Sequence, residues 1–131
     1  MNLFSLLQQG EQRLQSNDVL FHSQADVVLG ILRSTGSIPS KRTSLNGELH
    51  RAVAAALVTA YDEDTTIDIT VRRAETFHAY GYSTKIISYL DAAIANGLLT
   101  SQTGKAKGRL HLGPVLEDYL ADTYFSHIRE A

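Results

Sequence analysis

The chain has 131 residues, with 12 Lys and Arg against 14 Asp and Glu, so its formal net charge is −2. The lack of Cys excludes disulfides, Cys-based zinc sites and cysteine nucleophiles. A hydrophobic content of 44% is too high for a disordered chain, and the length suffices for one domain with a buried core. The overall charge argues against a surface coated in basic residues for nucleic acid.

Targeting and membrane signals are not evident in the sequence. The first 15 residues, MNLFSLLQQGEQRLQ, lack the basic start and apolar run of a secretory signal. The longest apolar stretch, 52–60, is well short of the roughly 20 residues that span a bilayer. We therefore expect a soluble, intracellular (cytoplasmic) protein with no membrane partner, and the lack of Cys fits a reducing compartment.

Helical periodicity dominates the first half of the chain. A first helix is expected from Leu3 to Leu14, weakened in its middle by Gly10. Ser23 can act as the N-cap of a second helix, and a loop rich in Gly, Ser and Pro follows at 35–42. A third helix is expected over 44–61, where apolar residues recur at helical spacing around an alanine-rich centre.

Short strands and helices alternate after residue 64. Residues 65–70 read TTIDIT, an alternation that predicts a strand, and Thr70 can cap a helix over 71–80. Ser83 begins a further helix that runs to 96. The following Gly97 predicts a left-handed C-terminal stop.

A hairpin and a last helix complete the prediction. Strands are expected at 98–101 and 109–112, joined by a tip at 102–108 that is rich in Gly and Lys. Pro114 is well placed as the first residue of a final helix that continues through Ile128.

The element order from 44 to 112, together with TVRRAE (70–75), STKIISYL (83–90) and GLL (97–99), resembles the winged helix-turn-helix family of DNA-binding proteins. The resemblance covers about half the chain and extends to no narrower family. It implies a mainly α (α+β) fold with a winged helix-turn-helix core and a small β-hairpin wing. On this basis 44–113 is the winged helix-turn-helix domain, and 1–43 and 114–131 are flanking helical segments for packing or dimerisation.

The helix over 83–96 takes the place of the recognition helix in such domains. Its free face is expected to enter a major groove, which admits an α-helix, and to offer short hydrogen-bonding side chains and one cation. The residues expected to contact DNA from this helix are Ser83, Thr84, Lys85, Ser88 and Tyr89. Two of them have structural alternatives, because Ser83 is first a helix cap and Tyr89 can equally be half-buried.

A second set of cations is expected to contact phosphates. The wing, residues 102–109, is expected to lie on the DNA backbone or in a minor groove. The expected phosphate contacts are Arg72, Arg73, Lys105, Lys107 and Arg109. The alternative is a solvated hairpin tip for the three wing cations, and ordinary surface for the two arginines.

The charge is unevenly distributed along the chain. Residues 65–112 hold six basic and three acidic residues, a net charge of +3, whereas 1–64 have a net charge of −2 and 113–131 of −3. The basic segment coincides with the predicted DNA-reading unit, which is the distribution that nucleic-acid binding requires.

Motifs for catalysis or metal binding are not found. The five His show neither an HExxH motif nor a pair at helical spacing, and the acidic run 62–64 lacks the spacing and glycine of a calcium loop. No phosphate-binding loop, serine elbow or dinucleotide fingerprint occurs. We expect no enzyme, no catalytic residue, no metal and no cofactor.

The sequence leaves three functions open. The leading hypothesis is a homodimeric, repressor-like transcriptional regulator that binds double-stranded DNA, because apolar terminal helices are suited to two-fold pairing. The alternative is a winged-helix interaction subunit with a protein partner, in a chromosome-handling, plasmid-maintenance or replication complex. The third is a ligand- or metal-responsive regulator with an effector pocket near Tyr61, Phe77, Tyr80 and Tyr82.

Overall fold

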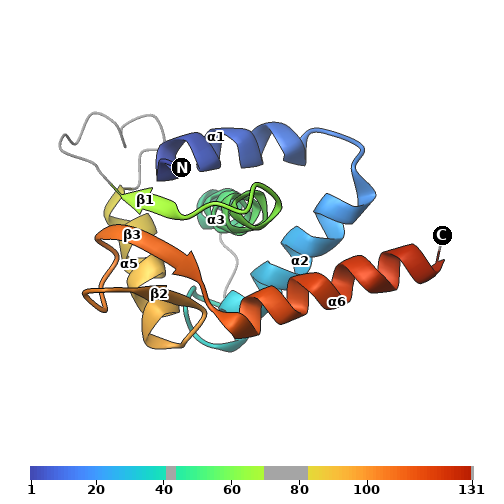
Figure 1. Cartoon of the computed structure of the whole chain (residues 1–131). Coiled ribbons are helices and arrows are strands. Elements are labelled where there is room, and N and C mark those ends of the chain that lie inside the picture. The colour runs from blue at the N-terminus through green and yellow to red at the C-terminus, as the bar shows by residue number, and fades with distance from the viewer. Residues whose placement is uncertain (41–43, 70–82, 131) are drawn as a thin grey trace.

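The computed structural model describes residues 1–40, 44–69 and 83–130, and within these ranges it has five helices and three strands (Figure 1). The helices are α1 (Leu3–Leu14), α2 (Val19–Ser34), α3 (Ser44–Asp62), α5 (Ser83–Ala95) and α6 (Pro114–Glu130). The strands are β1 (Ile67–Ile69), β2 (Leu99–Ser101) and β3 (Gly108–Leu112). The expected mainly helical α+β class is therefore confirmed. The helix expected over 71–80 lies outside the described residues.

Helix α2 begins earlier than the sequence analysis predicted. Asp18, not Ser23, is its N-cap, since Asp18 Oδ1 accepts a hydrogen bond of 3.0 Å from the backbone N–H of Phe21. The prediction was wrong because Asp18 was assigned to the break between helices, although Asp is among the best N-cap residues. Asn2 caps α1 in the same way, through a bond of 2.7 Å from the N–H of Phe4.

The core is built around α3, which Figure 1 shows end-on with α1 lying across it. Every residue from 52 to 60 is buried. Gly10 of α1 lies directly against α3, because a Cβ at that position would lie 2.9 Å from the Cβ of Ala55. A glycine in the middle of a helix, unfavourable in isolation, is therefore required by the packing of α1 on α3.

Arg13 joins the ends of three helices. Its Nη2 lies 2.7 Å from Oδ2 of Asp62 at the end of α3, and its guanidinium lies 4.0 Å from the ring centroid of Phe21 in α2. This cation therefore stabilises a corner of the helical layer.

The three strands form an antiparallel sheet in the order β1-β3-β2. Ile67 lies opposite Leu110, and Leu99 lies opposite Leu112, so buried residues of all three strands face the core. The pairing brings β1 directly beside the hairpin that follows α5. Gly97, with φ +77°, ends α5 in the left-handed conformation that was predicted and turns the chain into β2.

Helix α6 packs one face on α2 and exposes the other. Leu116 and Leu120 are fully buried, and Gln24 of α2 donates a hydrogen bond of 3.3 Å from Nε2 to the carbonyl of Leu120. Exposed apolar side chains remain on the rest of its surface: Val115, Tyr119, Tyr124, Phe125 and Ile128. None of the helices in the described ranges is long and apolar enough to cross a membrane.

Candidate nucleic-acid interface

Helix α5 has one buried and one exposed face. Ile86, Leu90 and Ala93 are fully buried against the core, whereas Lys85 and Ser88 are exposed. The two exposed residues are three apart, so they lie on one face near the start of the helix. In helix-turn-helix proteins, residues near the start of the recognition helix reach base edges.

The wing is docked on this exposed face of α5. Asp91, one turn after Ser88, accepts a hydrogen bond of 2.6 Å at Oδ1 from the backbone N–H of Ala106, and Ala106 is only 7% exposed. Within the tip, Ser101 Oγ donates to the carbonyl of Lys105 at 2.8 Å. The wing therefore has a defined position beside the helix, although it is rich in Gly and Lys.

Docking of Ala106 also positions the two wing lysines. Lys105 and Lys107 flank this buried residue and are both exposed. Because Ala106 is bonded to Asp91 of α5, the two wing lysines lie close to the exposed side of this helix. This contact was not predicted from the sequence, where its only local signal is one acidic residue on the exposed side of α5.

A hollow of about 560 Å³ runs along the outer side of the wing. The residues that line it are mostly hydrogen-bond donors and cations: Gln102, Thr103, Lys107, Gly108, Arg109 and His111. Lys and Arg side chains together with hydroxyl and amide donors are the groups that contact phosphate oxygens in protein–DNA complexes.

Arg109 is partly committed to a neighbour in the sheet. It lies opposite Asp68 in the β1-β3 ladder, with 3.5 Å between Arg109 Nε and Asp68 Oδ1, while its own side chain stays 70% exposed. The pKa of Asp68 is lowered, first by the hydrogen bond from Thr66 and further by the Met1 ammonium and Arg109, against the opposing effect of burial. The ion pair with Asp68 therefore holds Arg109 in the sheet and balances part of its charge.

Tyr89 packs in the core. It is 8% exposed, and its hydroxyl lies 3.2 Å from Nε2 of His50 with the two rings edge to face. His50 is fully buried, and burial, then Arg33 and Lys85, lower its pKa. The structural alternative for Tyr89 is therefore favoured, and we withdraw this residue from the expected base contacts.

The other predicted site residues are placed only in part. Ser83 and Thr84 are in the first turn of α5, but their side chains lie outside the description. Arg72 and Arg73, and the aromatic residues Phe77, Tyr80 and Tyr82 of the third hypothesis, also lie outside the described residues. Lys85 and Ser88 are exposed on α5, and Lys105, Lys107 and Arg109 are exposed on the wing, which the bond between Asp91 and Ala106 holds beside α5.

Two further observations bear on chemistry at this surface. In the described parts of the chain, His, Asp and Glu side chains do not gather in a group of three that could hold a metal ion. No family model, no curated protein and no solved structure matches the chain.

Proposed function

We propose that this protein is a sequence-specific, double-stranded DNA-binding regulator of the winged helix-turn-helix type, acting as a repressor-like homodimer. Helix α5 would lie in the major groove, with the wing on the backbone or in the adjacent minor groove. The observation that carries the proposal is the hydrogen bond between Asp91 and Ala106, because it holds the wing and its cations beside the exposed side of α5.

The exposed face of α5 suits insertion into a groove. Ser88 is short, so it leaves room for close approach, and Lys85 places one cation near the base edges or phosphates. On this proposal Lys85 contributes to discrimination between sequences, whereas the wing lysines contribute mainly to affinity.

The charge distribution supports the same assignment. The net charge of +3 over 65–112 is flanked by two acidic segments, so the segment of the sequence that holds α5 and the wing is the one that attracts DNA. Such a modest charge favours binding to one defined site over non-specific coating of DNA.

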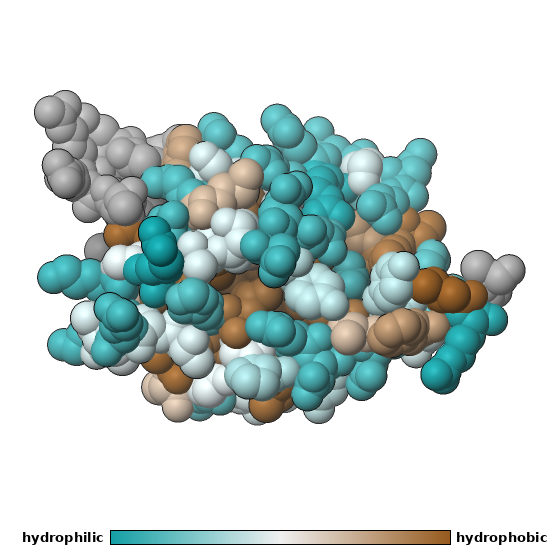
Figure 2. All heavy atoms as spheres, in the orientation of Figure 1, coloured by the Kyte–Doolittle hydropathy of each residue, from teal (hydrophilic) through white to brown (hydrophobic). Residues whose placement is uncertain are grey.

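Helix α6 offers the surface for dimerisation. Phe125 and Ile128 are 56% and 48% exposed near its end, where Figure 2 shows apolar side chains gathered. Two copies of α6 paired across a two-fold axis would cover these apolar side chains. Dimers of helix-turn-helix proteins read half-sites about 34 Å apart.

The test is selection of duplexes from a random pool, followed by anisotropy titrations over a salt series. Selection should yield a short palindrome. Lys85→Ala should bind selected and unrelated duplexes with more equal affinity. Lys105→Ala and Lys107→Ala should weaken binding to all duplexes alike and lower the salt slope by about 1 each. The charge-preserving controls Lys105→Arg and Lys107→Arg should keep both the affinity and the salt slope of the parent. Absence of duplex binding at low salt would refute the proposal.

The alternative, an interaction subunit of a larger complex, is favoured by a different observation. The exposed apolar side chains of α6 and the overall net charge of −2 are as suitable for a protein partner as for a second copy. A stoichiometric partner that stays bound after nuclease treatment, combined with no duplex selection, would favour this function.

A further inference from the structure

His50 is a fully buried titratable side chain that contacts the helix proposed to read DNA. It lies on α3, and its Nε2 is 3.2 Å from the hydroxyl of Tyr89 on α5, with 5.2 Å between the ring centroids. Tyr89 is one turn after Lys85, and residues four apart are neighbours on a helix. The imidazole therefore packs against α5 close to the cation that is proposed to meet DNA.

One ring nitrogen of His50 lacks a partner. Nδ1 is buried and has no hydrogen-bond partner in the part of the chain that the structure describes. A neutral imidazole can leave a lone pair at this position, whereas a protonated ring has an N–H there that needs an acceptor. The bond at Nε2 is compatible with both forms, because the Tyr89 hydroxyl can donate or accept and burial raises the pKa of that hydroxyl. The environment of Nδ1 thus favours the neutral ring.

The charges around His50 favour the neutral ring as well. Burial lowers the pKa of His50, and two cations, Arg33 of α2 and Lys85 of α5, lower it further. Among the described residues no carboxylate opposes them, and Glu48 and Arg51, the charged neighbours of His50 on α3, are exposed. Part of what keeps a proton off this buried ring is therefore the charge of a proposed DNA contact.

Bound DNA would change this balance. In the proposed complex Lys85 lies beside base edges or phosphates, and the negative charge of the DNA backbone offsets the repulsion between Lys85 and a proton on His50. The effect reaches the ring because charges act over longer distances through a protein interior than through water. The complex would therefore hold a proton on His50 at a higher pH than the free protein does.

We infer that binding of DNA by α5 is coupled to the uptake of a proton at His50, so that the protein binds its duplex more tightly as the pH falls. The inference rests on the proposed function and adds a regulatory input to it. Coupling is reciprocal, since a ligand that favours the protonated ring must itself bind the protonated protein better.

The sign and size of the effect follow from linkage. The affinity for DNA should be constant above the pKa of His50 in the complex, rise as the pH falls through that value, and level off below the pKa in the free protein. A pKa that is higher by about half a unit in the complex corresponds to a gain of up to about threefold in affinity.

The experiment is an NMR titration of the imidazole groups between pH 7.5 and pH 5.5, for the full chain alone and in complex with a selected duplex. His50 should titrate at a higher pH in the complex. Calorimetry of the same binding reaction, in two buffers of different ionisation enthalpy, should show uptake of protons. If a duplex binds and His50 titrates at the same pH in both states, the inference is overturned and the proposed function stands. If no duplex binds, both are refuted.

Substitution of Lys85 tests the electrostatic coupling without DNA. Lys85→Gln should raise the pKa of His50 in the free protein, and Lys85→Arg, which keeps the charge, should not. Lys105→Gln removes the same charge from the wing, and Lys105 is not among the charges that shift His50, so the titration of His50 should stay that of the parent. An unchanged titration in Lys85→Gln, or an equal shift in Lys105→Gln, would overturn the inference.

His111 provides the control for general effects of protons on DNA binding. It is exposed and lines the hollow of the wing, so a proton on it would also attract phosphates. His50→Gln should reduce the pH dependence of the affinity, whereas His111→Gln should leave the contribution of His50 in place. A pH dependence as large in His50→Gln as in the parent would overturn the inference. If His50→Gln does not fold, which circular dichroism shows, the NMR titration of the parent decides.

Discussion

The missing side chain at Gly10 determines how closely α1 and α3 pack. We expect Gly10→Ala to destabilise the protein by about 1–3 kcal/mol, because the new methyl group must displace the backbone of α3 at Ala55. The higher helix propensity of Ala, about 1 kcal/mol, offsets only part of this. Urea unfolding followed by circular dichroism measures the difference.

Gly30 provides the matched control within the same helical layer. It is exposed in the interior of α2, and a Cβ there would meet nothing within 4 Å. Gly30→Ala should therefore stabilise the protein by about 0.5–1 kcal/mol. If both substitutions change the stability in the same direction, the close approach of α1 to α3 is not what requires glycine at position 10.

His50 makes the stability of the core depend on pH. Its pKa is lowered from 6.5 by burial and by Arg33 and Lys85. His50 therefore takes up a proton at a lower pH in the folded protein than in the unfolded chain. The free energy of unfolding should therefore fall as the pH drops below 6.5 toward the lowered value, with a slope of at most about 1.4 kcal/mol per pH unit. Unfolding measured between pH 7.5 and pH 5 would show this.

Two variants test whether His50 is the source of that slope. His50→Gln should remove it, since Gln does not titrate. Tyr89→Phe takes away the hydroxyl beside Nε2 and should destabilise the protein by about 1–2 kcal/mol at every pH while the slope remains. A slope that persists in His50→Gln would assign the pH dependence to another group.

At the scale of elements, the contact between the wing and α5 joins the two parts of the proposed interface. Asp91 has two opposing effects on DNA binding, because its charge repels phosphates while its oxygen holds the wing. Asp91→Asn removes the charge and keeps an acceptor, so it should bind duplexes more tightly. Asp91→Ala removes both, and its affinity should be about tenfold lower than that of Asp91→Asn.

Hydrogen exchange provides a measurement of the same contact without DNA. The N–H of Ala106 is bonded to Asp91 at 2.6 Å, so it should exchange slowly in the parent and faster in Asp91→Ala. Equal exchange rates in the two proteins would show that the wing does not depend on this bond.

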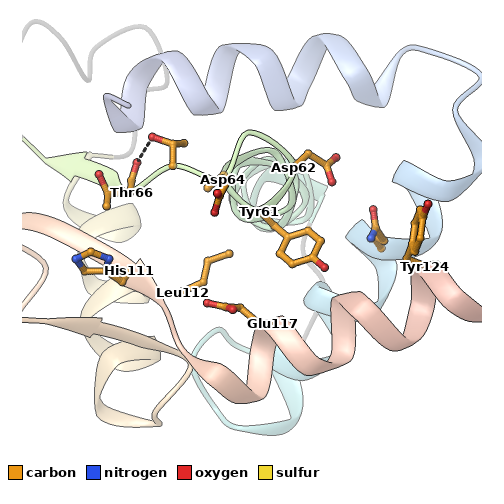
Figure 3. A pocket seen from close by; sticks show the side chains of 11 residues that line it. Tyr61, Asp62, Asp64, Thr66, His111, Leu112, Glu117 and Tyr124 are labelled. Atoms are coloured by element: carbon orange, nitrogen blue, oxygen red, sulfur yellow. Dashed lines mark hydrogen bonds between the residues drawn. The ribbon is translucent and has the colours of Figure 1, made fainter.

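The elements also show what the sequence can and cannot predict. Gly97 and Pro114 are local signals: the first was predicted to end the helix now labelled α5 and the second to begin α6, and both predictions are confirmed. The wing contacts α5 through the side chain of Asp91, which is 15 residues from Ala106 in the sequence. No periodicity in the sequence indicates such a contact. The hollow shown in Figure 3 is lined by residues from 24 to 124, so its composition becomes visible only once α2, α3, β3 and α6 are packed.

Tyr89 is instructive for a different reason. It lies three residues after Ile86 and four before Ala93, so helical spacing places it next to these apolar residues, which are buried. Its hydroxyl made it a candidate for base contacts, but the side chain is amphipathic, and His50 of α3 supplies a buried partner for that hydroxyl. That partner comes from a distant helix, which the sequence does not indicate.

At the scale of the whole molecule, the basic wing and the apolar end of α6 lie at opposite ends in Figure 1. A second copy bound through the end of α6 would therefore leave both wings and both α5 helices uncovered. The proposed dimer contact and the proposed DNA contact then use different parts of the molecule, so substitutions can separate them.

The double substitution Phe125→Ser and Ile128→Ser is therefore expected to abolish dimerisation without unfolding the chain. Both side chains are about half exposed, so the free energy of unfolding of the monomer should change by no more than about 0.5–1 kcal/mol. Sedimentation should show a dimer for the parent and a monomer for the variant, and the variant should bind a palindrome no better than one half-site.

Val19→Ser is the control. It removes an even more exposed apolar side chain, 65% exposed on α2, and should leave the dimer intact. If the parent sediments as a monomer and only one copy binds the palindrome, the apolar end of α6 contacts something other than a second copy of this chain.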